Sequence, residues 1–255
     1  MYNRLNIFKI INSGIISLCL FGFLFSEQSL AIVTKSNGNV SYKNYLKKEF
    51  INTLNAGSEL FNNDLVRTGS DGFVKFTYLD DGTTIKINKD SELYIRGQVS
   101  NKNINKRINM SNGLIKLDVS KQNQDEFVII TPTSVASVKG TSFILDSKED
   151  GDNFYGYEGV VEVLNKESNQ VVRLSKNIKI VSKPDGVINS EIITQQDANV
   201  LDSFVELEED VEIEQQQNES DAQEADDDSP QMNELRIKVL TPSGEEKTII
   251  IKYNE

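Results

Sequence analysis

The sequence predicts an all-β protein, and three observations support this. Between residues 32 and 184, short runs alternate apolar and polar side chains, as in Phe73–Tyr78 and Thr84–Asn88. Turn residues separate these runs at intervals of about ten residues, and Asp80-Asp81-Gly82 supplies the positive φ angles of a tight hairpin. Helical periodicity is absent from this stretch. Strands so short and frequent indicate a sandwich, a barrel or a solenoid.

The first 31 residues have the pattern of a signal peptide. Arg4 and Lys9 precede an apolar run from Ile15 to Phe25, and Ser29-Leu30-Ala31 places small residues at −3 and −1. The run is shorter than the roughly 20 apolar residues of a membrane-spanning helix. We therefore expect cleavage between Ala31 and Ile32 and export to the periplasm or cell surface. The alternative is an uncleaved N-terminal segment, which would then be the chain's one membrane contact.

Composition excludes several kinds of chemistry. The whole chain has no histidine and no tryptophan, and its single cysteine, Cys19, lies within the expected signal peptide. Ser/His/Asp and Cys/His catalytic systems and His/Cys zinc sites therefore cannot form in the mature chain. No cofactor is expected, and stability must come from apolar burial, because disulfides are absent.

Charge is divided unevenly along the chain. Residues 32–190 hold 21 Lys and Arg against 19 Asp and Glu, whereas residues 206–229 hold 12 acidic and no basic residues. The −12 of the whole chain thus belongs to one segment. Since nucleic-acid binding needs a basic face, no nucleic-acid partner is expected.

Three zones follow the β domain expected over residues 32–184. Residues 185–205 are expected to form either a short helix, with Thr194 and Asp197 as a capping pair, or a linker. Residues 206–230 are predicted to be an acidic disordered linker. Residues 231–255 are predicted to form a β-hairpin from Leu235–Leu240 and Lys247–Tyr253, which could pair with a strand of a partner or of its own domain.

Carboxylates are the remaining catalytic candidates. A glycan hydrolase would need two of them across a bond, and the candidates are Asp80, Asp81, Asp90, Glu92 and Glu158. Asp80-Asp81 is better explained as part of a turn. Asp150–Asn153 looks like a calcium loop but fails the EF-hand spacing, so we interpret it as a solvated loop, and Gly97–Arg107 as a loop or ragged edge.

Two stretches resemble the FecR-domain family. The first combines a glycine turn, a Val-Arg-Thr segment and Asp-Gly-Thr between two strands; the second combines Thr-Pro-Thr, Val-Lys-Gly-Thr-Ser-Phe and Glu-Gly before a valine-rich strand. The residues that carry the resemblance are Gly57, Arg67, Thr68, Asp81, Gly82, Thr131, Pro132, Lys139, Gly140, Thr141, Phe143, Glu158 and Gly159. It spans residues 32–181, with Lys139 where the family usually has arginine.

The resemblance implies a short β-solenoid-like domain, with a β-sandwich as the alternative. FecR itself is an inner-membrane regulator of a diderm bacterium, with a cytoplasmic part that controls a sigma factor. Here nine residues precede the apolar run when it is extended back to Ile10, so we expect the stand-alone exported class. The motif residues are interpreted as structural, with Gly140 and Gly159 in turns and Phe143 in the core.

The expected function is therefore a non-catalytic extracytoplasmic binding or scaffold module whose partner is an envelope protein or glycan. One alternative is a membrane-anchored signalling receptor that keeps its N-terminal helix. The second is a carboxylate-based glycan hydrolase, which the turn interpretation of Asp80 and Asp81 disfavours.

Overall fold

The computed structural model describes residues 28–45, 49–51, 54–100, 103–122, 126–198, 200–204, 233–240 and 246–253. The all-β prediction is confirmed, since sixteen strands form one continuous sheet. The apolar run of the expected signal peptide and the acidic linker lie outside the described residues. The expected C-terminal hairpin is present as the antiparallel pair β17 (Asn233–Leu240) and β18 (Glu246–Tyr253).

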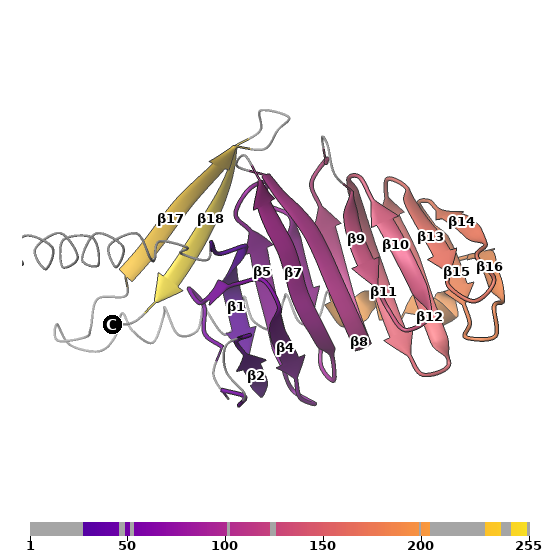
Figure 1. The fold of residues 1–255 in the computed structure, drawn as a ribbon, viewed down its shortest axis with the longest axis horizontal. Coiled ribbons are helices and arrows are strands. Elements are labelled where there is room, and N and C mark those ends of the chain that lie inside the picture. The colour runs from indigo at the N-terminus through magenta and orange to yellow at the C-terminus, as the bar shows by residue number, and fades with distance from the viewer. Residues whose placement is uncertain are drawn as a thin grey trace, which may run out of the picture.

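The sixteen strands form two layers (Figure 1). In pairing order, the first layer contains β3 (Glu59–Leu60), β1 (Ala31–Asn37), β5 (Phe73–Tyr78), β6 (Thr84–Ile87), the second part of β8 (Asn103–Val119), β11 (Thr141–Lys148), β12 (Gly151–Glu158), β15 (Ile178–Ser182) and β16 (Ile188–Ile192). The second layer contains β2 (Val40–Lys43), β4 (Asp64–Thr68), β7 (Glu92–Ser100), the first part of β8, β9 (Phe127–Ile130), β10 (Ser134–Val138), β13 (Val161–Asn165) and β14 (Val171–Leu174).

Strand β8 joins the two layers. Its first part pairs with β7 and β9, and its second part pairs with β6 and β11. The crossing point is Gly113, where φ is 122°. A Cβ at this position would lie 2.2 Å from Oγ of Ser91 and 2.5 Å from its Cα. A side chain therefore fits neither the backbone angle nor the space, and the crossing requires glycine.

Most of the chain advances by antiparallel hairpins that alternate between the layers: β9–β10, β11–β12, β13–β14 and β15–β16. Among the strands that the structure describes, β8–β9 is the one parallel pair. A β-solenoid instead stacks successive coils in parallel. The solenoid detail is thus not confirmed, and the two facing antiparallel layers correspond to the sandwich alternative.

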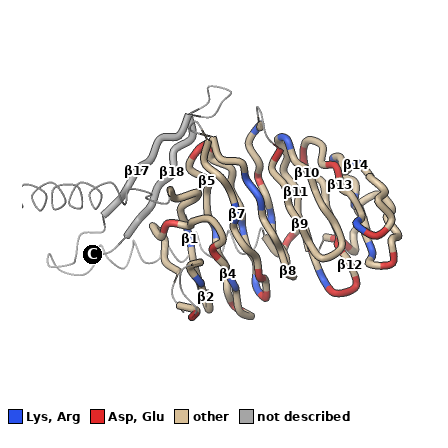
Figure 2. The backbone as a smooth tube through the Cα atoms, in the orientation of Figure 1, with Lys and Arg blue, Asp and Glu red and all other residues tan. Residues whose placement is uncertain are grey.

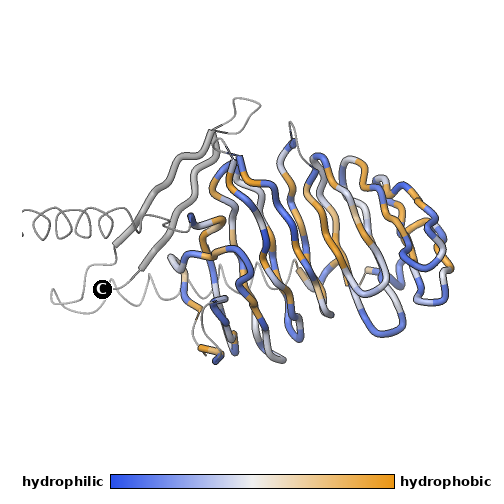
Figure 3. Tube along the Cα trace, in the orientation of Figure 1, coloured by the Kyte–Doolittle hydropathy of each residue, from blue (hydrophilic) through white to orange (hydrophobic). Residues whose placement is uncertain are grey.

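The core lies between the layers, and the alternation of the sequence produces it. Apolar and polar residues alternate along β7 and β8, as the orange and blue segments of Figure 3 show. The ring of Tyr78 in the first layer meets that of Phe127 in the second edge to face, with centroids 5.8 Å apart. One continuous cluster of buried apolar side chains runs between both layers.

Two predicted loops are strands instead. Gly97–Arg107 was expected to be a loop or a ragged edge, but Gly97 pairs with Lys106 in the hairpin of β7 and β8. This pairing forms because Ile104 and Ile108 alternate into the core. Asp150–Asn153 was also expected to be a loop, but the turn is confined to Glu149 and Asp150. Asp152 is a buried part of β12.

The β domain was expected to end at residue 184, and the described sheet continues past that residue. Strand β16 pairs with β15 beyond it, and the chain then lies on the outer side of the first layer. The hydroxyl and backbone N–H of Thr194 both donate to Asp197, and Lys179 on β15 donates to Asp197 over 3.0 Å. Residues 200–204 are helical, and Phe204 is buried against Ile144 and Tyr155. The described part of the β domain therefore extends to Phe204.

Leu30 and Ala31, which precede the expected cleavage site, belong to the fold. Leu30 is 1% exposed; its N–H donates to the carbonyl of Leu60, and its own carbonyl accepts from Leu79. Ala31 is fully buried and pairs with Tyr78. Cleavage before Ile32 would remove both residues. No helix in the described part of the chain is long and apolar enough to cross a membrane.

We predict that Leu30→Ala lowers the free energy of unfolding by about 2–4 kcal/mol, because it leaves a cavity in the core. Ser29→Ala is the matched control. Ser29 is partly exposed, and its change is expected to stay within about 0.5 kcal/mol. Urea unfolding followed by far-UV circular dichroism measures both. Equal stability of the Leu30→Ala chain and the unchanged chain would show that this residue is dispensable.

Candidate functional site

A lysine lies inside the sandwich. Lys106 occupies an inward position of β8, between Ile104 and Ile108, and is 2% exposed. The alternation of β8 fixes this orientation, since every second residue faces the core. A buried ammonium group is costly unless it is paired, so its surroundings are the first candidate for a functional site.

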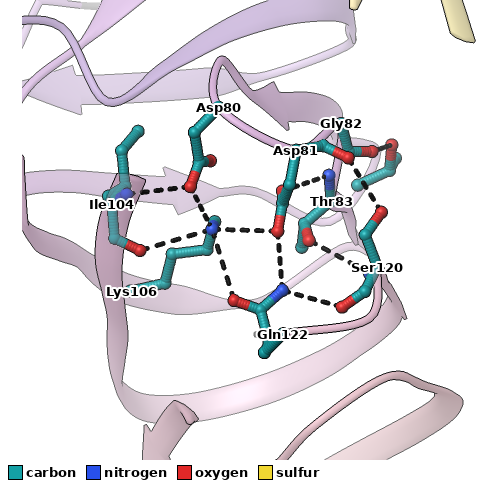
Figure 4. A network of polar contacts seen from close by, with 9 residues as sticks. Asp80, Asp81, Gly82, Thr83, Ile104, Lys106, Ser120 and Gln122 are labelled. Atoms are coloured by element: carbon teal, nitrogen blue, oxygen red, sulfur yellow. Dashed lines mark hydrogen bonds and ion pairs between the residues drawn. The ribbon is translucent and has the colours of Figure 1, made fainter. Parts of the chain in front are cut away.

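Two carboxylates and an amide surround the lysine (Figure 4). Nζ of Lys106 lies 2.6 Å from Oδ2 of Asp80 and 2.9 Å from Oδ2 of Asp81. It also donates to the carbonyl of Ile104 over 3.3 Å and to Oε1 of Gln122 over 3.5 Å. The two aspartates come from the β5–β6 turn in the first layer, so the ion cluster ties the two layers together.

Asp81 is held by more than the lysine. Its Oδ1 accepts from the N–H of Thr83 over 2.8 Å, and its Oδ2 accepts from Nε2 of Gln122 over 2.6 Å. The hydroxyl of Ser120 donates to the Asp81 carbonyl. Gly82 follows with φ at 73°. The family's Asp-Gly-Thr segment is thus a hairpin turn whose aspartate points inward.

The cluster has one negative charge in excess when both carboxyls are ionised. Burial raises the pKa of Asp80, repulsion from Asp81 raises it further, and Lys106 opposes both effects. Burial also raises the pKa of the Tyr78 phenol. Oδ1 of Asp80 and the Tyr78 hydroxyl are buried and have no hydrogen-bond partner. Ionised Asp80 is therefore the strained member of the cluster, in the sense that burial and the neighbouring charge disfavour its ionised form.

The other carboxylate candidates do not join this pair. Asp90 lies exposed in the connection before β7, with φ at 54°. Glu92 is on β7, where its carboxylate pairs with Arg67. Glu158 is exposed at the end of β12. The five candidates are thus not assembled around an open cleft, and the side chains of Asp80 and Asp81 are 7% and 5% exposed.

The Thr-Pro-Thr segment closes the opposite edge of the sandwich. The hydroxyl of Thr131 donates to Oδ2 of Asp152 over 2.6 Å and accepts from the N–H groups of Thr133 and Ser134. Ser147 donates to the other oxygen of Asp152. Thr131 follows β9 in the second layer, whereas Asp152 belongs to β12 in the first. Exposed Pro132 lies at the tip of this turn, so the segment fastens the layers.

The second motif lines an open hollow of about 500 Å³. Its walls include Lys139, Gly140, Thr141 and Glu158, from the connections that cross between layers. The hydroxyl of Thr141 donates to the carbonyl of Val160, and Lys139 pairs with Glu126 over 2.9 Å. The hydrogen bond to Glu126 raises the pKa of Lys139.

The close packing of this crossing explains its glycines. A Cβ on Gly159, where φ is 76°, would lie 2.5 Å from the carbonyl oxygen of Gly140. Phe143 is fully buried in the core. Lys139 and Glu158 are the exposed charged residues of the motif. Asp118 and Lys121 also line the hollow, so it offers charges of both signs.

The remaining motif residues lie elsewhere. Gly57 has φ at 88° and donates its N–H to the carbonyl of Val33. Arg67 lies on the outer side of β4, with its guanidinium 4.5 Å from the centre of the Phe50 ring. The buried hydroxyl of Thr68 donates to the carbonyl of Asn88. These contacts are structural and place no reactive group in a cavity.

Sequence reasoning missed Lys106 and Gln122, which complete the ion cluster. The available signal was the alternation of Ile104, Lys106 and Ile108, which places the lysine on the apolar face of its strand. Within the described residues, no group of three or more acidic or other metal-binding side chains could hold a metal ion.

Residues 64–162 match the family model described as FecR protein. The chain contains a FecR domain. The match includes the ion-cluster turn, the Thr-Pro-Thr segment and the hollow, and it leaves Gly57 outside. The chain matches no curated protein.

Two crystal structures of a candidate anti-sigma factor from Parabacteroides distasonis ATCC 8503, at 2.50 and 1.65 Å resolution, are similar to the chain at 20% identity. The TM-scores are 0.45 and 0.44. The match covers 53% of this chain and 62% of theirs, so the chain spans less than two thirds of their length.

The strain at Asp80 predicts opposite effects for the two aspartates. A carboxyl whose pKa is raised on folding stabilises the fold below its unfolded value of about 4 and loses that contribution as pH rises through the folded value. At pH 7, Asp80→Asn should therefore match or exceed the stability of the unchanged chain, and the difference should shrink as pH falls towards about 4. Its amide oxygen can still accept from Lys106 and Ile104.

Asp81→Asn is the matched control, because its NH₂ group must replace one of two satisfied acceptor oxygens. We expect it to lose about 1–3 kcal/mol at pH 7. Urea unfolding at several pH values between 4 and 8 measures both variants. Equal losses for the two would show that Asp80 is not the strained carboxyl.

Lys106→Met should lose about 3–5 kcal/mol at pH 7, because it leaves two buried carboxylates without a cation. The loss should shrink as pH falls, because protonation of Asp80 removes one of the two buried negative charges. Lys89→Met removes an exposed lysine and should change stability by less than about 0.5 kcal/mol. Thermal unfolding of both variants checks the difference, and a pH-independent loss would contradict the charge explanation.

Proposed function

We propose that the chain is an exported, non-catalytic FecR-domain module that binds an envelope protein or glycan in the periplasm or at the cell surface. The observation that carries this proposal is the burial of the paired carboxylates. Asp80 and Asp81, the neighbouring acids that a glycan hydrolase would need, are sealed by Lys106 inside the core. Hydrolysis requires carboxylates that reach a substrate.

The family match supports a role in signalling or regulation. The charged motif residues Arg67, Lys139 and Glu158 are exposed on the surface, where they can take part in recognition. Exposed charge on a rigid two-layer scaffold suits binding better than chemistry. The signal-like N-terminus supports an extracytoplasmic location.

In-cell crosslinking tests the binding role. The tagged full-length chain would be crosslinked in its host and purified, and its partners identified by mass spectrometry alongside its own intact mass. One reproducible envelope partner that binds the purified chain directly is the expected result. A chain that is retained at full length in the inner membrane with a cytoplasmic partner would favour the receptor alternative.

A chain ending after Phe204 tests the tail. It keeps β16 and the 193–204 segment, which a cut at residue 190 would break. If the tail supplies a pairing strand, this shorter chain loses partner binding while its thermal unfolding is unchanged. Unchanged partner binding assigns recognition to the FecR domain itself.

The hydrolase alternative has a separate test, which uses exposed Glu158 because its replacement should not disturb folding. Polysaccharide and peptidoglycan breakdown by the unchanged chain, lost in Glu158→Gln with unfolding unaffected, would overturn the non-catalytic proposal. No measurable breakdown by either chain is the expected result.

A further inference from the structure

Two arginines face each other on the outer side of the second layer. Arg96 on β7 and Arg107 on β8 are direct cross-strand partners. Both point away from the core, because Ile95 and Ile108 beside them point into it. Figure 2 shows the basic segments that lie side by side along β7 and β8 near the middle of the layer. Like charges placed directly opposite on a sheet destabilise it.

Neither arginine has an ion-pair partner within the described part of the chain. The guanidinium of Arg96 lies 5.7 Å from the centre of the Tyr94 ring, and its Nε is buried without a hydrogen-bond acceptor. Other arginines of this outer surface are paired across strands. Arg67 pairs with Glu92, and Arg173 pairs with Glu162 over 3.0 Å. The uncompensated pair is thus a local exception.

The surface next to the arginines is apolar and incompletely covered. Val128 is the cross-strand neighbour of Arg107, and Ile130 is that of Asn109. Val135 pairs with Ile130 and with Leu164, so these side chains are contiguous. All four apolar side chains are partly exposed. Oδ1 of Asn109, on the same strand as Arg107, is buried without a hydrogen-bond partner.

We propose that this arginine face, made of Arg96, Arg107, Val128, Ile130, Val135 and Leu164, binds an acidic polypeptide segment of a partner protein. Partner carboxylates would pair with Arg96 and Arg107, and apolar side chains would cover the four aliphatic residues. The inference deepens the proposed binding function and rests on it.

The composition of the face favours a polypeptide over other anions. Arginine is enriched in the centres of protein interfaces. An anionic polysaccharide supplies carboxylates, but it has no aliphatic side chains to cover the four aliphatic residues of the face. Nucleic acid needs an extended basic stripe, whereas Glu92 and Glu162 lie on this same surface. Charge complementarity together with apolar cover thus identifies an acidic, partly apolar segment.

Direct binding measurements test the face. The probe is a short synthetic peptide in which glutamate and leucine alternate, and isothermal titration calorimetry measures its affinity for the full-length chain. Arg96→Gln with Arg107→Gln should weaken binding at least about tenfold, because two charge-assisted contacts are lost. Arg173→Gln, which removes a paired arginine from the same layer, should change it less than about twofold.

Equal weakening by Arg173→Gln would overturn the assignment, because it would show a general charge effect. So would peptide binding that the double variant leaves unchanged, or no peptide binding by the unchanged chain. Polygalacturonate that binds through Arg96 and Arg107 while the peptide does not would show a glycan site instead. Thermal unfolding of each variant confirms that the fold is intact.

The same variants separate this inference from the proposed function. If the envelope partner found by crosslinking binds the double variant as well as the unchanged chain, the binding function stands and the arginine face is wrong. If no partner is found but the peptide binds through both arginines, the face is correct and the proposed envelope partnership fails.

Discussion

The path of β8 determines the rest of the domain. This one strand pairs with β7 and β9 in one layer and with β6 and β11 in the other, so the two layers are aligned through its backbone. Gly113 makes the crossing sterically feasible, because a Cβ there would overlap Ser91. The hairpins that follow make their turns at the edge where β8 crosses, next to Asn112 and Lys148. The chain then passes between the layers at the opposite edge, where Gly140 and Glu158 lie close to Val119.

The buried lysine makes the register of β8 specific. A shift of one residue between β7 and β8 would move every side chain of β8 to the other face. Lys106 would then leave the core, and Asp80 and Asp81 would be buried without a cation. Desolvation offsets much of the attraction within such clusters, and the raised pKa of Asp80 shows that the cost is not fully recovered. We infer that the cluster acts mainly by disfavouring alternative strand pairings.

The sequence predicted the local structure better than the long-range contacts. Alternation and turn residues located most strands, and the structural role expected for Thr131, Gly140, Phe143 and Gly159 agrees with their contacts. The Asn- and Lys-rich stretch before Arg107 was misassigned because its average composition is polar, although its alternation is that of a strand. The partners of Lys106 lie 26, 25 and 16 residues away, and no local pattern encodes such pairings. The two-layer arrangement depends on the crossing at Gly113, which a sequence pattern does not distinguish from an ordinary turn glycine.

The same alternation separates the residues that define the family from those available to a partner. Thr68, Asp81, Thr131 and Phe143 face inward or close an edge, so the family motif specifies a scaffold and carries little information about what is bound. Recognition has to use outward positions, whose identity the fold leaves free. Arg96 and Arg107 occupy such positions, and their mutual repulsion is a cost to the isolated domain that no described side chain offsets. An acidic partner would remove that cost on binding. The repulsion between Arg96 and Arg107 is therefore itself an argument for a binding role of this face.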